Sequence, residues 1–134
     1  EPALVKAGNG DILALFRTTA GAGNVYQKRS TDNGATWGAA AVAFFGYSTP
    51  NVIKLASGTL VSVTRGTGGA LVAYTSIDNA TTWSSAYALD ATMYESQYGC
   101  PVQLADARVL VVYGYQPTSS NTNSDIKQVY VTEG

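Results

Sequence analysis

The chain has 134 residues, of which 46% are hydrophobic and 13% charged, with a formal net charge of -1 at pH 7. This composition is too apolar for a disordered chain, and the absence of a basic stretch argues against nucleic acid as a partner. No apolar run reaches the length of a membrane-spanning helix, so we expect no membrane association. Histidine is absent and Cys100 is the only cysteine. This removes the usual general base and the commonest metal ligand, so we expect neither a metal nor another cofactor.

Short apolar runs separated by turn residues predict an all-β protein, because this spacing is typical of a meander of short strands. In chain order, we expect strands at residues 3–7, 12–18, 25–30, 52–55, 60–65, 71–76, 101–104, 109–115 and 127–132. Asn9-Gly10 and Ser57-Gly58 lie between successive runs and have the composition of hairpin turns. Asp106-Ala107 occupies the same place in the third pair of runs.

The sequence also repeats itself with a period of about 48 residues. Residues 2–17 are similar to residues 50–65, and a third copy follows at residues 100–113. A period in this range, with about four strands in each repeat, is typical of β-propeller blades. We therefore predict one domain over residues 1–134, with blade 1 at about 1–46, blade 2 at about 47–94 and a partial third blade at about 95–134.

Two segments share the pattern Ser-x-Asp-x-x-x-Thr-Trp, one at residues 30–37 and the other at residues 76–83. The aspartate can accept hydrogen bonds from nearby backbone N–H groups and fix a tight turn, while the tryptophan packs between neighbouring sheets. The pattern predicts a structural role for Ser30, Asp32, Gly34, Thr36, Trp37, Ser76, Asp78, Thr82 and Trp83. We expect both tryptophans to be buried in equivalent places.

These two segments resemble the Asp-boxes, or BNR repeats, of the sialidase (neuraminidase) superfamily. Residues 2–17 look like the first blade of a sialidase, and residues 98–115 look like a later one. The resemblance implies a β-propeller, of which this sequence holds two four-stranded blades and an incomplete third, whereas a sialidase has six. It also implies a glycan ligand and a secreted or extracytoplasmic location, although the sequence carries no signal peptide.

Strand direction places several side chains that are able to carry chemistry at one rim of such a propeller, and Asp32 and Asp78 at the opposite edge. The rim residues are Glu1, Arg17, Tyr47, Arg65, Glu95, Tyr98 and Tyr115. Sialidases bind the substrate carboxylate with an arginine triad and use a tyrosine nucleophile, a glutamate and an acid/base aspartate. The resemblance implies substrate binding by Arg17, Arg65 and Tyr115, with Tyr98 and Glu95 as catalytic candidates.

Two departures argue against sialidase activity in this chain. The family's first triad arginine precedes the opening strand, where this sequence begins with Glu1-Pro2. The family's acid/base aspartate follows the position of Arg17, but residues 18–24 contain no carboxylate. Each candidate also has a structural alternative, namely an ion pair or a solubilising strand end for the arginines and packing between blades for Tyr98.

Three functions therefore remain open at this stage. The chain is a sialidase-like module that binds acidic glycans and is weak or inactive as an enzyme, a structural or protein-binding propeller, or a fragment of a larger exo-sialidase or other glycoside hydrolase. A row of three blades has two terminal apolar faces, and such faces normally acquire a partner. We therefore expect a head-to-tail homodimer that completes a six-bladed propeller.

Overall fold

The computed structural model describes residues 1–18, 23–47, 50–91, 94–119 and 125–132. Its strands form three antiparallel sheets, none of which closes on itself. Sheet A consists of β1 (Ala3–Lys6), β2 (Ile12–Arg17), β3 (Asn24–Ser30) and β4 (Ala41–Phe45). Sheet B consists of β5 (Asn51–Lys54), β6 (Leu60–Arg65), β7 (Leu71–Ser76) and β8 (Tyr87–Asp90). Sheet C consists of β9 (Glu95–Gln103), β10 (Val109–Gln116) and β11 (Asp125–Val131).

The prediction of an all-β protein is confirmed, and the described residues contain only one short helical turn, the 3-10 helix η1 (Thr67–Gly69). Two strands were missing from the strand prediction, namely β4 and β8, which are the outer strands of sheets A and B. Both are short, and neither has a strict alternation of apolar and polar residues. Strand β9 also begins six residues before the expected start at Pro101.

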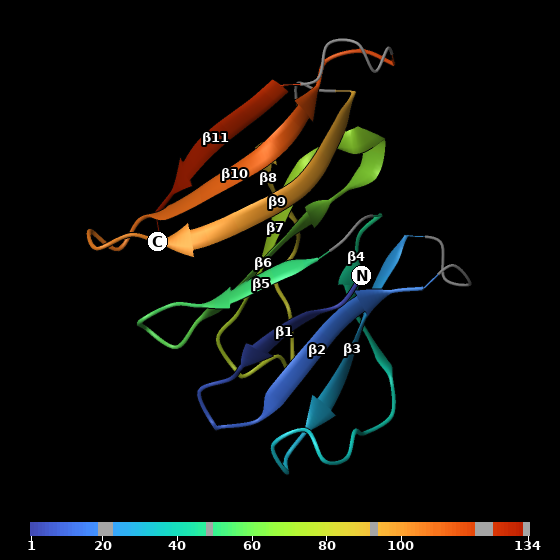
Figure 1. Cartoon of the computed structure of the whole chain (residues 1–134), viewed down its shortest axis with the longest axis vertical. Helices are drawn as coiled ribbons and strands as arrows, with labels where there is room; N and C mark the ends of the chain where they lie inside the picture. Colours follow the sequence, from blue (N-terminus) through green and yellow to red (C-terminus); the bar gives the residue numbers. More distant parts are fainter. Residues whose placement is uncertain (19–22, 48–49, 92–93, 120–124, 133–134) are drawn as a thin grey trace.

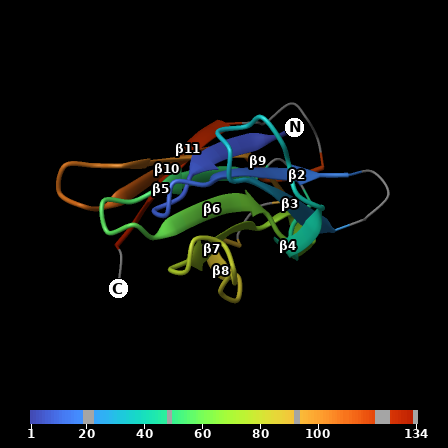
Figure 2. The ribbon, with the colours of Figure 1, turned by 90° about the horizontal axis from the view of Figure 1, so that it is seen from below.

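The three sheets are stacked in the order A, B, C, with sheet B in the middle (Figure 1). The first strands are neighbours, because β5 contacts both β1 and β9. Figure 2 shows the strands of sheet B following one another from β5 on one side of the molecule to β8 on the other. Since successive side chains of a strand point to opposite faces, each strand of sheet B contributes to two interfaces.

Sheet B buries both of its faces. Val52, Val72 and Tyr74 pack against Leu15 and Val25 of sheet A. The opposite face of sheet B packs against sheet C in a second cluster of buried side chains, which are Leu55, Val61, Val63, Leu71, Ala73, Val109, Val111 and Tyr113. The middle sheet therefore holds the core of the molecule together.

The two Ser-x-Asp-x-x-x-Thr-Trp segments form similar turns at the edge of the molecule. In the first, Thr36 donates two hydrogen bonds to the carboxylate of Asp32, from N at 2.8 Å and from Oγ1 at 2.6 Å. In the second, Thr82 donates to Asp78 from Oγ1 at 2.6 Å. A serine hydroxyl two residues earlier also donates to each aspartate. These hydrogen bonds all lie within the turn itself.

The expectation that both tryptophans are buried is wrong for Trp37, which is 38% exposed, and Trp83 is only partly buried. Trp83 instead lies between sheets A and B, where its ring meets Phe44 edge to face at 5.0 Å and its Nε1 donates to Gln27. The difference follows from position, because Trp83 faces sheet A whereas the corresponding face of sheet A meets no other sheet within the described residues.

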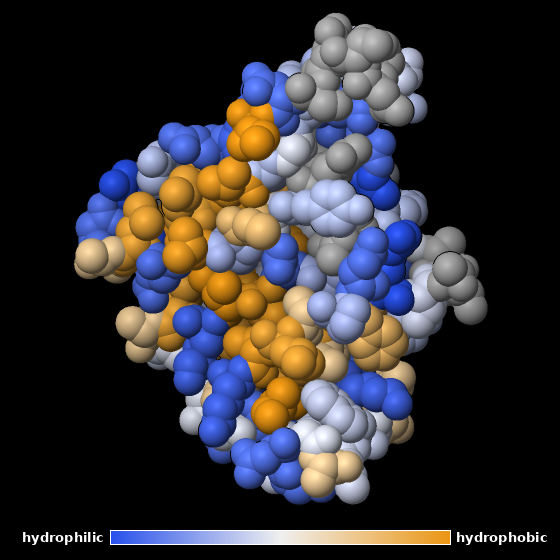
Figure 3. All heavy atoms as spheres, in the orientation of Figure 1, coloured by the Kyte–Doolittle hydropathy of each residue, from blue (hydrophilic) through white to orange (hydrophobic). Residues whose placement is uncertain are grey.

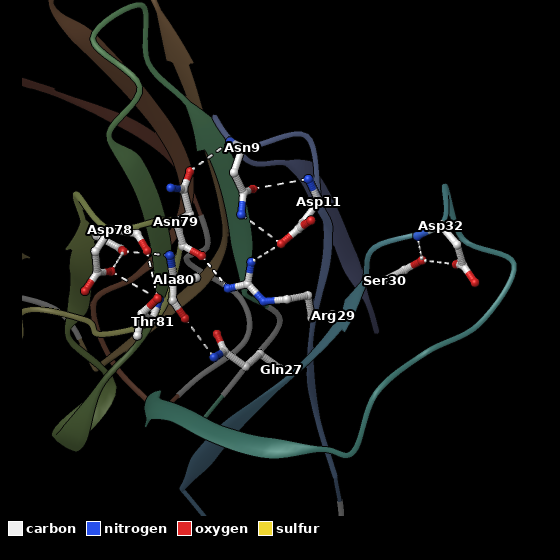
Figure 4. A network of polar contacts seen from close by, with 11 residues as sticks. Asn9, Asp11, Gln27, Arg29, Ser30, Asp32, Asp78, Asn79, Ala80 and Thr81 are labelled. Carbon is white, nitrogen blue, oxygen red and sulfur yellow. Dashed lines mark hydrogen bonds and ion pairs between the residues drawn. The ribbon is translucent and has the colours of Figure 1, made fainter.

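A polar network attaches the second turn to sheet A (Figure 4). Arg29 donates to the carboxylate of Asp11 at 2.7 Å and also to the backbone carbonyl of Asn79. Gln27 donates to the carbonyl of Ala80 at 2.9 Å. Hydrogen bonds to a charged donor are stronger than neutral ones, so this network adds directional contacts to the apolar packing around Trp83.

The two outer sheets leave hydrophobic side chains exposed. They include Leu4 and Val42 in sheet A, and Val102, Val112 and Tyr130 in sheet C. Figure 3 shows hydrophobic residues gathered in a band across the side of the molecule that faces the viewer in Figure 1. Within the described ranges, no helix has the length and apolar character that a membrane span requires.

Candidate functional site

The candidate site lies at the rim, the edge where β2, β6 and β10 end and where β1, β5 and β9 begin. We use this name for the edge that carries Glu1, Arg17, Tyr47, Arg65, Glu95 and Tyr98. Two ion pairs occupy it. Arg17 Nε lies 3.4 Å from Glu1 Oε2, and Arg65 forms a second ion pair with Glu95. The first pair is about half exposed on both sides, so it contributes little to stability.

Arg65 is the most enclosed cation of the rim. Its side chain is 22% exposed, and burial lowers the pKa of the guanidinium, with a smaller lowering from the charge of Arg17. The nearby Tyr98 acts in the opposite direction and raises the pKa of Arg65. The two arginines are therefore close enough for their charges to interact, and an anion bound between them would relieve their repulsion.

The backbone holds Arg65 in place through the chain segment that precedes β5. Tyr47 N donates to the carbonyl of Arg65 at 2.7 Å, and Arg65 Nη2 donates to the carbonyl of Tyr47 at 3.5 Å. The Tyr47 ring meets the Phe45 ring edge to face at 4.9 Å, and both rings are partly exposed. Aromatic surface therefore lies directly beside the cation.

Tyr98 sits on an irregularity of β9. The register against β10 shifts between Val112 and Gly114, and Tyr98 has a φ of 50°, in the left-handed region. A β-bulge of this kind redirects a side chain out of the regular alternation of a strand. The Tyr98 side chain is 60% exposed, so it is an accessible group and does not pack between sheets.

Two neighbours fix this bulge against sheet B. A Cβ on Gly99 would lie 2.6 Å from Val63 Cγ1, so only glycine allows β9 to approach this closely. Asn51 Nδ2 donates to the carbonyl of Gly99 at 2.9 Å and lies 3.4 Å from Cys100 Sγ. The backbone that carries Tyr98 is thus positioned by the middle sheet.

A close contact of the same kind places Glu95. A Cβ on Gly69, which has a φ of 86°, would overlap the carbonyl of Tyr94. The turn that contains Gly69 therefore supports the start of β9, and Glu95 reaches Arg65 from there. The close approach of sheets B and C at Gly69 and Gly99 therefore positions the backbone that carries the charged side chains of the rim.

The remaining candidates lie elsewhere. Tyr115 is half-buried and packs against the core between sheets B and C, with Lys127 Nζ 3.3 Å from the centre of its ring. Asp32 and Asp78 lie in the turns at the opposite edge, after β3 and β7. Hydrogen bonds from Thr36 and Thr82 lower the pKa of these two carboxyls to about 2. Among the described residues, no cluster of three acidic or cysteine side chains is suited to hold a metal ion.

Sequence reasoning offered an ion pair as the alternative role of Arg17 and Arg65 but did not name the partners, and it missed the bulge at Tyr98. Glu95 and Arg65 are 30 residues apart, and no local pattern relates them. The Tyr98-Gly99 pair was a weak signal for the bulge, because glycine within a strand often marks one or a close approach of another backbone.

The fold is that of known glycosidases. The chain superposes on a mutant of the NanB sialidase from Streptococcus pneumoniae with a TM-score of 0.74 and 19% identity, over 98% of this chain and 23% of that one. It superposes on the leech intramolecular trans-sialidase with a TM-score of 0.70 and 18% identity, over 98% and 23%. For the α-L-arabinofuranosidase of Podospora anserina, the TM-score is 0.66 and the identity 10%, over 98% and 54%.

These similarities establish a sialidase-like fold at low sequence identity. The chain spans about a quarter of the length of the two sialidases, or 23% of each. No protein-family model matches the sequence, and a search of curated proteins also returns no match.

Proposed function

We propose that this chain is a sialidase-like β-propeller module, with two Asp-box turns, that binds acidic glycans at the rim. The observation that carries the proposal is the proximity of Arg17, Arg65 and Tyr98 at one edge, where Arg65 is partly desolvated. Guanidinium groups pair with carboxylates through two parallel hydrogen bonds, which suits the carboxylate of an acidic sugar. The exposed rings of Phe45 and Tyr47 add an apolar surface for the rest of the glycan.

Glu95 acts in this proposal as an internal substitute for the ligand. Its carboxylate already pairs with Arg65, so a glycan carboxylate that reaches Arg65 must displace it or share it. Such competition lowers affinity, and binding by this chain is therefore expected to be weak. Glu1 likewise pairs with Arg17, so a glycan carboxylate that reaches Arg17 must displace or share Glu1.

Catalysis is expected to be weak or absent. A sialidase mechanism requires an acid/base carboxylate near the nucleophile, and residues 18–24, which follow Arg17, contain none. A fluorogenic sialoside assay tests this expectation. Robust turnover that disappears in Tyr98→Phe would show that the chain is an active enzyme.

Titration calorimetry with sialyllactose, with lactose as the neutral control, tests glycan binding. We expect sialyllactose to bind and the double variant Arg17→Ala, Arg65→Ala to bind at least about tenfold more weakly. Arg108→Ala is the matched control, because Arg108 is paired with Asp106 at the opposite edge and its side chain is 45% exposed, against 47% for Arg17. Equal binding of lactose, or binding that the double variant leaves unchanged, would contradict the proposal.

The same module is proposed to form a head-to-tail homodimer. In sheet A, the exposed face points away from sheet B, and by strand register it corresponds to the face of sheet B that packs on sheet A. In sheet C, the exposed face also points away from sheet B, and it corresponds to the face of sheet B that packs on sheet C. A second copy therefore offers each exposed face a counterpart of the type already used inside the chain.

A further inference from the structure

The turn after β7 contains a motif that the proposed function does not use. Residues 79–81 read Asn-Ala-Thr, the only Asn-x-Ser/Thr triplet in the sequence. Such a triplet is the acceptor sequence for an N-linked glycan, which is attached to the asparagine amide and belongs at the surface of a protein. Because short triplets also occur by chance, the surroundings of the asparagine decide whether a glycan fits.

The backbone of this asparagine is held against sheet A. Asn79 lies at a partly exposed position of the turn, at the edge opposite the rim. Its φ of 58° is in the left-handed region, which asparagine adopts more readily than most residues. The carbonyl of Asn79 accepts a hydrogen bond from Arg29, and the carbonyl of Ala80 accepts one from Gln27 at 2.9 Å. These contacts fix the backbone from which the side chain projects.

One half of the Asn79 side-chain amide is in use, and the other half is not. Its Oδ1 accepts a hydrogen bond from Asn9 N at 3.2 Å. Since a backbone N–H can only donate, it selects the oxygen of the amide, and Nδ2 lies on the side away from Asn9 (Figure 4). Within the described part of the chain, Nδ2 forms no hydrogen bond. The atom that accepts a glycan is therefore available while its carbonyl is anchored.

The space around the amide favours the same atom. The oxygen side is closely packed, because a Cβ on Gly8 would lie only 3.1 Å from Asn79 Oδ1. A sugar on Nδ2 would extend from the opposite side of the amide. A glycosylated amide also keeps its carbonyl, so the hydrogen bond from Asn9 N can persist after modification.

The turn after β3 provides a contrast within the same chain. Asn33 occupies the position equivalent to Asn79 and has a similar φ of 56°. Residues 33–35 read Asn-Gly-Ala, however, so the hydroxyl that an acceptor triplet requires is missing. We therefore expect modification at the second turn and none at the first.

We propose that Asn79 is a site of N-linked glycosylation in a chain that enters a secretory compartment. The donor is an oligosaccharide linked to a lipid diphosphate, and a transferase of the compartment catalyses the step. The bond between the anomeric carbon and the diphosphate oxygen breaks, a bond from this carbon to Nδ2 forms, and the amide releases one proton as the lipid diphosphate leaves. The glycan then lies opposite the rim and leaves the arginine site open.

Translation of the full chain behind a cleavable leader, in the presence of microsomes, tests the acceptor. In the folded turn, Thr81 Oγ1 donates to the carbonyl of Asp78 at 2.9 Å, so its hydroxyl is occupied and transfer takes place before the turn folds. We expect a gain in mass that peptide N-glycosidase removes, and peptide mapping should place the glycan on Asn79. An imported chain without this gain, or a glycan on another residue instead, would overturn the proposal.

Two neighbouring threonines provide the matched variants. Thr81→Val removes the hydroxyl of the triplet and should abolish the gain in mass. Thr82→Val removes a hydroxyl from the next exposed position, leaves the triplet intact and should retain the gain. Since the microsomes receive an unfolded chain, neither result depends on the stability of the variant. A glycan that persists in Thr81→Val, or that is lost in Thr82→Val, would contradict recognition of this triplet.

The folded glycoprotein tests the geometry of the amide. NMR spectra of the glycosylated chain and of the same chain made without the transferase should show the backbone amides of Asn9 and Ala80 at similar positions, because Nδ2 contributes to neither hydrogen bond. A shift of both amides to the values of an unfolded chain would show that the glycan disrupts the turn, and it would overturn the assignment of Nδ2 as the outward-facing atom.

Discussion

At the scale of single residues, the same chemistry recurs at equivalent positions of the repeat. Asp32 and Asp78 each accept hydrogen bonds from a threonine four residues later and a serine two residues earlier. The bonds from the threonine are the largest cause of the lowered pKa in both, ahead of the bond from the serine. The turns are thus built to hold a carboxylate in its charged form, and neither aspartate is suited to act as a general acid near neutral pH.

This environment predicts the acid behaviour of the two turns. Because the folded pKa of about 2 lies below the ordinary aspartate pKa of 3.8, ionised Asp32 and Asp78 stabilise the fold fully above pH 3.8. That contribution is lost as the pH falls through the interval down to about 2. NMR titration of the carboxyl carbons measures both pKa values.

Thr82→Val provides the control for this titration. It should raise the pKa of Asp78 towards 3.8 while the pKa of Asp32 stays near 2. An unchanged pKa for Asp78 in this variant would show that the hydroxyl bond from Thr82 is not its cause.

Gly99 supports a second prediction at this scale. An added methyl group would lie 2.6 Å from Val63 Cγ1 and 3.0 Å from Leu71 Cδ1, and both of these side chains are fully buried. We expect Gly99→Ala to lower the free energy of unfolding by about 1–3 kcal/mol, the usual cost of overpacking. Denaturant unfolding measures this change.

Gly38→Ala is the matched control for Gly99→Ala. The nearest atom to its added methyl group is the carbonyl oxygen of Arg29 at 3.5 Å, an ordinary contact. Its free energy of unfolding should stay within about 0.5 kcal/mol of the unaltered chain. If the two variants unfold alike, the close approach of β9 to sheet B is not a constraint.

At the scale of elements, the contribution of each turn to stability depends on whether a neighbouring sheet packs against it. The turn after β7 is held by Trp83, Gln27 and Arg29, and these contacts join sheet B to sheet A. The turn after β3 has the same internal hydrogen bonds, but its tryptophan is exposed. The two turns therefore share a local structure and differ in their tertiary role.

The two tryptophans are a natural pair for testing this difference. Trp83→Ala should lower the free energy of unfolding by about 3 kcal/mol, because it empties the space between sheets A and B. Trp37→Ala should lower it by about 1 kcal/mol or less. Thermal and denaturant unfolding of the two variants measure the contrast, and equal losses would contradict the assignment of Trp83 as the contact that joins the sheets.

At the scale of the whole molecule, the exposed faces of sheets A and C carry the proposal of assembly. Leu4 and Val42 lie on one face, and Val102 and Val112 on the other. Exposed apolar surface of this kind is characteristic of interaction sites. The two faces are of different type, so a contact between copies is head to tail.

The mass in solution tests this assembly. Light scattering after size exclusion should give twice the chain mass of 14.0 kDa. Leu4→Lys and Val112→Lys, each of which adds a charge to one face, should shift the mass to that of the monomer. Thr31→Lys, in the exposed turn after β3, is the control and should leave the dimer intact. A well-behaved monomer of the unaltered chain would contradict the proposed dimer.

The sequence alone determined the all-β class, most strands and the internal repeat. Apolar alternation and turn residues act over a few neighbouring positions, so strands such as β6 and β7 were predicted with their observed bounds. The short outer strands β4 and β8 were not predicted. Each has only four or five residues, and its strand conformation depends on tertiary pairing with β3 or β7.

The tertiary structure decided which of the predicted residues contact one another. The bulge that exposes Tyr98 depends on the approach of Gly99 to Val63, and the pairing of Glu95 with Arg65 depends on the packing of sheet C on sheet B. Likewise, the sequence assigned Trp37 and Trp83 the same place, but among the residues that the structure describes a neighbouring sheet packs against Trp83 and none against Trp37. Hydrogen bonds within a turn are fixed by local sequence, whereas burial and ion pairing depend on the partner surface that the fold supplies.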